Sequence, residues 1–285
     1  MNLENTIYAV LGATASGKTD KAIELALELD GEIVNCDSRQ IYSEMIIGTA
    51  SPTEDEKLKV KHHLFNFLSP TKKFSAADYQ DIAVPCIKDI LSRGKTPILT
   101  GGTGFYYSAV ADGLGEAGSD PKKSKELSEL LQKNGLDFMV ERLRKIDPIA
   151  AQTIDIKNSR RVLRAIEIVE TTGKPFAANK PVKPFPNIKF KTILVERDRS
   201  VLHERISKRI DLMLKIGLLD EVDYLIKKYG KEAPGLNAIG YMEWFDYFDG
   251  KIKLEQAREL VLIHTRQYAK RQCTWFRNKL NSNQN

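Results

Sequence analysis

The sequence has little of what builds disulfide-rich or zinc-binding proteins. Its 285 residues include three cysteines, Cys36, Cys86 and Cys273, which are far apart and odd in number. That arrangement excludes a disulfide framework and a cysteine–histidine zinc finger. We expect Cys36 and Cys86 to be small core residues of a protein in a reducing cytoplasm. The chain also lacks any Asp-Asp pair, which excludes the aspartate-rich magnesium motif of the all-helical prenyl synthases.

Long hydrophobic runs are absent as well. No stretch approaches the roughly 20 apolar residues that cross a bilayer, so we expect no membrane contact. The first ten residues, MNLENTIYAV, lack the charged start and hydrophobic stretch of a secretory signal. They contain acidic residues and no arginine, which argues against an organelle transit peptide. The chain is longer than one typical domain, so a main domain with a smaller second one is expected.

Acidic residues are scarce in the second part of the chain. Residues 1–113 hold 11 Lys and Arg against 15 Asp and Glu, whereas residues 114–285 hold 33 against 23. The net charge of +6 therefore comes entirely from the second part. A small phosphorylated ligand needs few charges, so a broad basic excess favours a polyanionic partner. A generically basic surface explains the same numbers, and charge alone leaves both interpretations open.

Residues 12–19, GATASGKT, match the phosphate-binding pattern G-x-x-x-x-G-K-[ST] at every fixed position. A short apolar run precedes the pattern and a helical pattern follows it, which is the context that a phosphate-binding loop requires. Backbone N–H groups of such a loop and the following helix N-terminus attract a diphosphate or triphosphate. Lys18 adds a full positive charge, and the Thr19 hydroxyl is placed to hold Mg²⁺.

Strand and helix patterns alternate in the first part of the chain, which predicts an α/β fold with a parallel sheet. We expect strands at residues 7–11, 32–36, 96–100 and 190–195. A helix should open at Ser75, where Ser75 and Asp78 form a capping box. Helical periodicity over residues 124–172 and a proline-rich connection over 173–189 predict an inserted helical domain. We therefore expect a P-loop NTPase-like core at 1–114 and 190–285, with an all-helical insertion at 115–189.

Two polar segments follow predicted strands. Asp37 is the first polar residue after the second strand, and Thr103 lies in the Gly101-Gly102-Thr103-Gly104 turn after the third. Ligands of open parallel sheets bind at the carboxyl ends of the strands, so both segments should face the phosphate loop. Asp37 then serves as a Mg²⁺ partner or a general base, although an N-cap role is also common for Asp. The glycines suit close approach of a ligand, or simply a tight turn.

Basic residues gather on helices of the second part. Arg205 and Arg209 share one helix face, and Arg209 could clamp a diphosphate opposite Lys18 or belong to a solvated surface. The final helix interleaves cations with Tyr268 and Trp275, a pattern that suits a single-stranded RNA loop. Core packing of the aromatic rings is the alternative. The insertion adds a third basic cluster, Arg160, Arg161 and Arg164.

Together these segments resemble the tRNA dimethylallyltransferase family, of the bacterial type without a zinc-finger extension. The matching pieces, in family order, are GATASGKT, DSRQIY, IGTASP, FSAADYQ, PILTGGTGFYY, SRRVLRAIEI, LHERISKRIDLML, AIGYMEW and YAKRQCTWFR. The resemblance implies transfer of a dimethylallyl group from dimethylallyl diphosphate to N6 of the adenosine on the 3′ side of the anticodon. It also implies Mg²⁺ as cofactor and the tRNA anticodon stem-loop as partner. We expect the chain to act as a monomer.

The resemblance further implies roles for single residues. Asp37 resembles the general base, Thr103 a residue close to the target nucleotide, and Arg209 a second diphosphate clamp. The implied diphosphate-binding residues are Gly12, Ala13, Thr14, Ala15, Ser16, Gly17, Lys18 and Thr19, with Thr19 also facing the metal. The implied tRNA-binding residues are Asp37, Ser38, Arg39, Gln40, Arg160, Arg161, Val162, Leu163, Arg164, Gly240, Tyr241, Lys270, Arg271, Gln272, Thr274, Trp275 and Arg277. The chain departs from the family at Ser124, Asn237 and Met242, where many members carry arginine.

Three other functions fit part of the pattern. A small-molecule kinase would use the same phosphate loop but would need neither the basic insertion nor the glycine-rich turn. An isopentenyltransferase acting on free adenine nucleotides would not need an extended basic surface. A non-enzymatic RNA-binding module would not need the phosphate loop together with Asp37.

Overall fold

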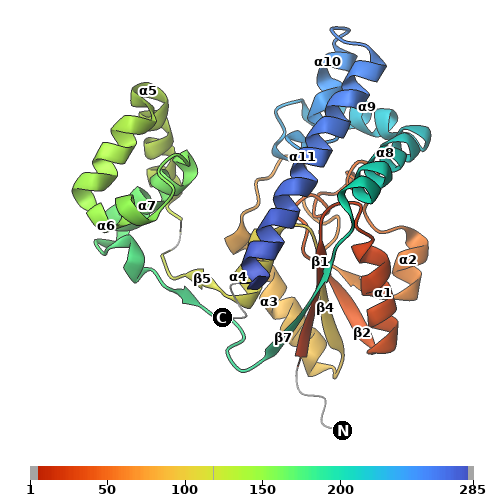
Figure 1. Cartoon of the computed structure of the whole chain (residues 1–285), viewed down its shortest axis with the longest axis horizontal. Coiled ribbons are helices and arrows are strands. Elements are labelled where there is room, and N and C mark those ends of the chain that lie inside the picture. The colour runs from red at the N-terminus through yellow and green to blue at the C-terminus, as the bar shows by residue number, and fades with distance from the viewer. Residues whose placement is uncertain (1–5, 118, 282–285) are drawn as a thin grey trace. The chain divides into compact units, whose positions relative to one another are not determined.

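The computed structural model describes residues 6–117 and 119–281 and contains a five-stranded parallel sheet (Figure 1). The strand order is β3-β2-β4-β1-β7, so β4 lies between β1 and β2. The strands are β1 (Thr6–Gly12), β2 (Gly31–Asn35), β3 (His62–His63), β4 (Thr96–Gly101) and β7 (Lys189–Val195). The four predicted strands are confirmed, each end within one residue, and the short edge strand β3 was missed. The predicted P-loop-like α/β class is therefore correct.

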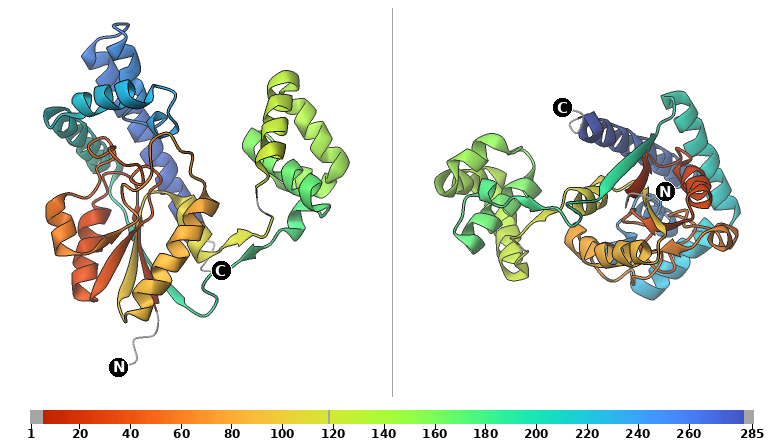
Figure 2. Two further views of the ribbon diagram at one scale, coloured as in Figure 1. Left: turned by 180° about the vertical axis from the view of Figure 1, so that it is seen from behind. Right: turned by 90° about the horizontal axis from the view of Figure 1, so that it is seen from below.

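Alternate residues of the strands supply two hydrophobic layers, as the two-residue period of a strand requires. Val10, Ile33 and Ile98 pack with α1 (Lys18–Glu28) on one face of the sheet. The other face carries Leu11, Val34 and Leu99 and packs against a larger cluster that includes α3 and α11. Figures 1 and 2 show α1 and α3 covering opposite faces.

Some of the remaining helices of this part were expected from the sequence, and others were not. The capping box at Ser75 and Asp78 is confirmed at the start of α3, which continues through Pro85. The unexpected elements are a capped helix, α2, and the short helical segments of residues 234–248, η2, η3 and α10. The bounds are α2 (Glu54–Lys59), α3 (Ala76–Ser92), α4 (Gly104–Ala111), α8 (Arg199–Lys215), α9 (Leu218–Tyr229), η2 (Pro234–Leu236), η3 (Met242–Trp244), α10 (Phe245–Phe248) and α11 (Leu254–Asn281).

The chain divides into two compact units, one made of residues 1–111 and 185–285 and the other of residues 112–184. The second unit has its own core, in which Leu127, Met139 and Ile166 are buried. Its helices are α5 (Pro121–Ile146), interrupted at Gly135 where φ is 81°, α6 (Pro148–Thr153) and α7 (Ser159–Thr172). The short η1 (Phe176–Ala178) follows α7.

The expectation that the insertion is entirely helical is wrong in one respect. β5 (Leu114–Gly115) and β6 (Pro181–Val182) pair in an antiparallel ribbon at the two ends of the unit. The prolines of residues 173–189 indicated an extended connection, and its pairing with residues 114–115 could not be seen from either segment alone. Gly118 of the linker-like stretch and residues 1–5 of the signal analysis lie outside the described residues. Across the described part of the chain, no helix is long and apolar enough to cross a membrane.

Candidate functional site

The phosphate-binding loop joins β1 to α1 in a conformation that fixes two of its glycines. A Cβ on Gly12 would lie 2.7 Å from the Val195 carbonyl oxygen and from the Ser16 hydroxyl. Gly17 has φ of 92° and stands at the N-cap of α1, where a left-handed conformation favours glycine. Among the described residues, no side chain caps this helix end. Its first N–H groups and the helix dipole are therefore available to an anion.

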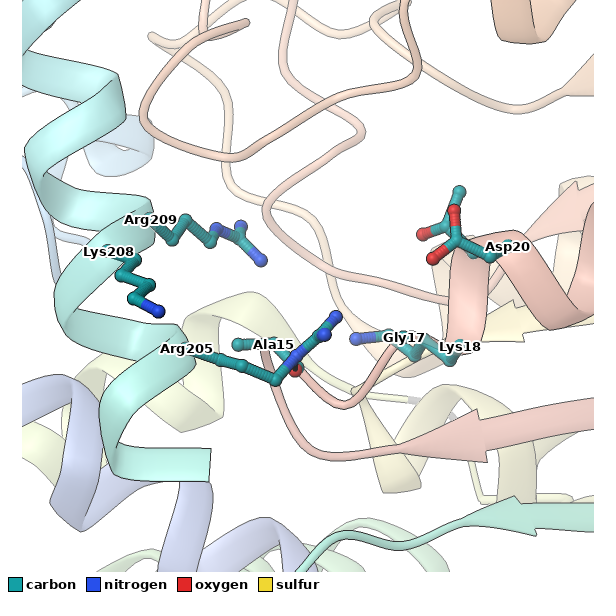
Figure 3. Close-up of a pocket in the computed structure, with 8 residues that line it drawn as sticks. Ala15, Gly17, Lys18, Asp20, Arg205, Lys208 and Arg209 are labelled. Atoms are coloured by element: carbon teal, nitrogen blue, oxygen red, sulfur yellow. Dashed lines mark hydrogen bonds between the residues drawn. The ribbon is translucent and has the colours of Figure 1, made fainter. Parts of the chain in front are cut away.

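A pocket of about 340 Å³ opens between this loop and α8 (Figure 3). Lys18 points into it from the loop side, and Arg205, Lys208 and Arg209 point into it from α8. Because these cations converge from two elements, the pocket can bind a multiply charged anion. The spacing of Arg205 and Arg209 indicated a shared face, whereas Lys208 was missed although it lies three residues after Arg205. The remaining lining residues are Ala15, Gly17, Thr19 and Asp20.

Electrostatics within the pocket link these cations to Asp37. Burial lowers the pKa of Lys18 to about 8, while the Asp37 carboxylate raises it and the Arg209 guanidinium lowers it. Burial also lowers the pKa of Arg209, and Asp37 again acts in the opposite direction. Arg209 donates to the Thr49 carbonyl at 3.4 Å. The carboxylate at the end of β2 is therefore close enough to the cationic pocket to influence both groups.

Two arginines support the loop through its carbonyl groups. Nε of Arg205 donates to the Ala15 carbonyl at 2.8 Å, and Nε of Arg197 donates to the Ser16 carbonyl at 3.1 Å. These two hydrogen bonds hold the loop by its carbonyl oxygens. This arrangement suits a loop whose N–H groups bind an anion. No local pattern singles out Arg197, because it lies in the connection between β7 and α8 and belongs to no motif.

Asp37 is held in a turn directly after β2. Its backbone N–H donates to the Asn35 side chain at 2.9 Å, and its Oδ1 accepts the Arg39 backbone N–H at 2.9 Å. Its Oδ2 lies toward the glycine-rich turn, 3.4 Å from where a Cβ on Gly102 would be. One carboxylate oxygen is thus bound by the backbone, and the other faces the turn.

The Gly101–Gly104 turn follows β4 and has no room for side chains at its three glycines. Added Cβ atoms would lie 2.0 Å from the Cys36 carbonyl oxygen at Gly101, 2.2 Å from Nε2 of Gln272 at Gly102, and 2.4 Å from the Trp275 ring at Gly104. Thr103 Oγ1 accepts the Ser38 backbone N–H at 2.9 Å and donates to the Ser38 hydroxyl at 3.2 Å. The turn therefore packs directly on the segment that carries Asp37.

Most residues of the final helix that were predicted to bind tRNA are on its surface. Lys270, Arg271, Thr274 and Arg277 are exposed, and Arg277 donates to Glu196 at 2.6 Å. Burial, followed by the Asp37 carboxylate, raises the pKa of Tyr268 to about 12, so its phenol stays protonated. Trp275 packs between Gly104 and the rings of Phe105 and Phe276. Gln272 is only 5% exposed.

Within the second unit, the predicted basic cluster divides into exposed and bonded members. Arg160 and Arg161 are exposed on the first turn of α7. Arg164 donates to Glu167, which is 4% exposed, and to the Ala117 carbonyl. The side chain of Val162 is fully buried and Leu163 packs against the same core, so these two side chains belong to the core of the unit and their assignment to tRNA binding stays a prediction. Ser124 donates to Glu167 at 2.9 Å.

The other predicted tRNA contacts lie in two loops of the first unit. Gln40 donates to the carbonyls of Thr49 and Ala50, at 3.2 and 2.7 Å. Tyr241 is fully buried, and its hydroxyl donates to Glu221 at 2.7 Å. Gly240 has φ of 91°. The side chains of Gln40 and Tyr241 are therefore bound within the protein, although both belong to segments predicted to touch RNA.

Glu221 is a residue that the sequence did not single out. Its Oε2 accepts the backbone N–H groups of Ile46 and Ile47 at 2.9 and 2.7 Å. Its Oε1 accepts the Gly48 N–H at 3.0 Å and the Tyr241 hydroxyl. The loop held in this way continues to Thr49, whose carbonyl accepts from Arg209. No local pattern marks such a residue, because its three backbone partners are more than 170 positions earlier and Tyr241 is 20 positions later.

Comparison with known proteins places similarity over nearly the whole chain. Residues 40–279 match the family model described as IPP transferase. The tRNA dimethylallyltransferase of Halalkalibacterium halodurans is 41% identical, covering 98% of this chain and 90% of that protein. The crystal structure of the full-length tRNA isopentenylpyrophosphate transferase from Bacillus halodurans has a TM-score of 0.69 at 40% identity, covering 96% of this chain and 88% of that one. A eukaryotic dimethylallyltransferase acting on tRNA has a TM-score of 0.81 at 28% identity, covering 95% of this chain and 69% of that one.

Proposed function

Since the chain belongs to the IPP transferase family, we propose that it transfers a dimethylallyl group from dimethylallyl diphosphate to tRNA. The acceptor is N6 of the adenosine that follows the anticodon on its 3′ side, and pyrophosphate is the second product. The observation that carries the proposal is the convergence of Lys18 with the cations of α8 on one pocket at the phosphate-binding loop, with Asp37 close enough to influence two of these cations.

The cationic pocket stabilises the leaving group. When the bond between the allylic C1 and the diphosphate oxygen breaks, its electron pair goes to the pyrophosphate, whose negative charge grows. The first N–H groups of α1, Lys18 and Arg209 face this charge, and Arg205 and Lys208 line the same pocket. Groups arranged in advance around a developing charge stabilise the transition state more than the ground state, and this difference lowers the barrier.

Asp37 removes the proton from N6 of the adenosine. The N6 lone pair is delocalised into the ring, so attack on C1 requires loss of an N6 proton as the new N–C bond forms. Since Arg39 binds Oδ1, the proton goes to Oδ2. Thr103 holds the Ser38 backbone beside this carboxylate and thereby orients the base. General-base catalysis of this kind contributes roughly 10²–10⁴-fold.

The oxygen donors of the pocket fit a magnesium ion. The Thr19 hydroxyl and the Asp20 carboxylate line it together, and hard oxygen ligands are those that Mg²⁺ prefers. Mg²⁺ usually combines one or two protein oxygens with substrate phosphates. Thr19 would therefore hold the ion, with Asp20 as a second oxygen donor, and the ion would neutralise charge on the diphosphate.

Each of the two units carries exposed cations that can contact the phosphates of the anticodon stem-loop. The adenosine must leave its stack, which costs roughly a few kcal/mol, and contacts to RNA phosphates offset that cost. Arg160, Arg161, Lys270 and Arg271 are exposed and available for such contacts. If about five phosphates are neutralised, log K should fall with log[salt] with a slope near −3.5. Cytoplasmic location and a monomeric state stay predictions.

The test is incubation of the protein with labelled dimethylallyl diphosphate and tRNA, AMP or ATP in separate reactions. Label in tRNA alone supports the proposal. Label in AMP or ATP indicates an enzyme for free nucleotides, and phosphoryl transfer from ATP without use of the allylic diphosphate indicates a kinase. Asp37→Ala should lower turnover at least ~100-fold with tRNA affinity changed only a few fold. Asp55→Asn, an exposed position on α2, is the matched control, and wild-type turnover by Asp37→Ala would refute the base assignment.

A further inference from the structure

One buried amide connects the two loops on which the proposed reaction depends. Gln272 lies on α11 and is 5% exposed. Its Oε1 accepts the backbone N–H of Thr14 at 2.9 Å, and its Nε2 donates to the backbone carbonyl of Gly102 at 2.8 Å. The orientation of the amide is fixed, because a backbone N–H can only donate and a carbonyl can only accept.

The two backbone groups belong to opposite sides of the reaction. Thr14 is in the loop that binds the diphosphate, whereas Gly102 precedes Thr103, whose hydroxyl holds the segment of Asp37. β4 separates β1 from β2 in the sheet, so the turn after β4 stands between the phosphate loop and Asp37. The distance from the leaving group to the base therefore depends on how far the phosphate loop lies from this turn, and Gln272 spans that distance.

The surroundings of Gln272 leave little freedom to that arrangement. A Cβ on Gly102 would lie 2.2 Å from Nε2 of Gln272, so the turn approaches the amide as closely as a glycine allows. A neighbour on the same helix, Trp275, packs in the same way on Gly104. α11 thus fixes the turn through two side chains, and only Gln272 of these two also contacts the phosphate loop.

Burial separates Gln272 from the neighbours with which it was grouped as a tRNA contact. Lys270, Arg271 and Thr274 are exposed, whereas both polar atoms of Gln272 are bound to backbone. The amide keeps one unused N–H and one unused lone pair, but at 5% exposure it is largely shielded from the surface that RNA would contact. We infer that Gln272 is a positioning residue, which sets the separation between the diphosphate-binding loop and the Asp37 side of the site. This inference rests on the proposed transfer reaction.

The amide is chemically specific, because the position needs one donor and one acceptor. Gln272→Leu removes both bonds and keeps the approximate volume. Gln272→Glu keeps the acceptor for the Thr14 N–H but places a carboxylate oxygen next to the Gly102 carbonyl oxygen, where neither can donate. Protonation of the introduced carboxyl group restores a donor to the Gly102 carbonyl. A displacement of about 1 Å between reacting groups costs on the order of 100-fold in rate.

The experiment measures single-turnover transfer to tRNA, the KM for dimethylallyl diphosphate, and tRNA affinity, for both variants between pH 5 and 8. Gln267→Glu is the control, because Gln267 is exposed on the same helix. We expect the kcat of both Gln272 variants to fall ~10–100-fold at pH 8, with tRNA affinity within threefold of wild type. The rate of Gln272→Glu relative to wild type should rise as pH falls, while the ratio for Gln272→Leu stays constant.

Two results would overturn the inference. One is kcat at the wild-type level in both variants with weakened tRNA binding, which would make Gln272 an RNA contact. The other is a rate for Gln272→Glu, relative to wild type, that does not change with pH. That result would show that a donor to the Gly102 carbonyl is not needed, and it can be obtained even when Gln272→Leu does not fold. Failure of the proposed function is distinguishable, because the wild-type protein would then transfer no label to tRNA.

Discussion

The leaving-group side of the site and the acceptor side are built on different physical principles. On the leaving-group side, cations from the phosphate loop and α8 converge on one pocket. On the acceptor side, the turn, Asp37 and α11 are joined by neutral hydrogen bonds between side chains and backbone. Charge interactions weaken gradually with distance, whereas hydrogen bonds weaken steeply with distance and angle. The first side should therefore depend on charge, and the second on placement.

Removing the loop cation should have the largest effect on the leaving-group side. Lys18→Met preserves the shape of the pocket but removes the positive charge nearest to the loop. We expect kcat to fall ~10²–10³-fold, the usual cost of removing one preorganised group that faces a developing charge. Single-turnover transfer measures the effect. Lys21→Met is the control, because Lys21 pairs with Glu24 on the same helix. A loss below tenfold would indicate that the α8 cations suffice.

A change at Glu221, which holds the loop of residues 46–48, tests whether the position of Arg209 matters as well as its charge. Glu221→Gln places an amide NH₂ group, a donor, against backbone N–H groups that are also donors. We therefore expect the free energy of unfolding to fall by about 1–3 kcal/mol and the Tm to fall by several degrees. Because the loop continues to the carbonyl that binds Arg209, transfer should also slow ~10-fold. Thermal melts and kinetics compare it with Asp223→Asn on the same helix. An unchanged transfer rate in a destabilised protein would limit Glu221 to folding.

The pH response should distinguish the two sides further. Burial lowers the pKa of Lys18 to about 8, so in the free protein its positive charge is lost as pH rises through about 8. kcat/KM for dimethylallyl diphosphate should then fall up to tenfold per pH unit above 8. Bound diphosphate favours the charged lysine, so kcat should begin to fall only at higher pH. The decline should disappear in Lys18→Met; its persistence there would assign it to another group.

Burial of Lys18 also has a consequence for stability with a definite sign. The unfolded chain, in which lysine titrates near 10.5, binds more protons than the folded chain between pH 8 and 10.5. The contribution of this residue to the free energy of unfolding therefore rises with pH across that window. In the same window, the affinity for the diphosphate falls.

The smallest effects are expected from surface cations that bind RNA. Arg160→Ala combined with Arg161→Ala removes two exposed charges and should reduce the magnitude of the salt slope for tRNA binding by about 1.4. Arg164→Ala should instead destabilise the second unit, because its partner Glu167 is buried. Binding titrations at several salt concentrations give the slopes. Equal slopes for wild type and the double variant would place the RNA elsewhere.

Much of the leaving-group side could be predicted because its residues fall in two short segments, residues 12–19 and residues 205–209. Residues 12–19 form one motif, and the same glycines that identify it also fix its backbone. Asp37 was found by its position after a strand, and Arg209 by its spacing from Arg205. The link between the two sides was not predictable in this way, because Gln272 and its partner Thr14 are 258 positions apart. Its sequence neighbours are exposed cations, so a surface role was the natural interpretation.

Local patterns also hid which charges are available. Arg160, Arg161 and Arg164 are equivalent in the sequence, yet Arg164 is bound to Glu167 and to a backbone carbonyl. Tyr241 and Val162 lie in segments matched to RNA contacts, although both side chains are fully buried. Burial and pairing depend on long-range packing, and a motif assigns a function to a segment without saying which of its side chains reach the surface.

The glycine-rich turn limits how the acceptor preference can be changed. Each of its three glycines abuts a different structure: the end of β2, the amide of Gln272, and the ring of Trp275. A side chain added at any of the three glycines to change the acceptor preference would first collide with Cys36, Gln272 or Trp275. Engineering of the acceptor preference would therefore have to begin outside this turn, at positions that do not pack on Cys36, Gln272 or Trp275.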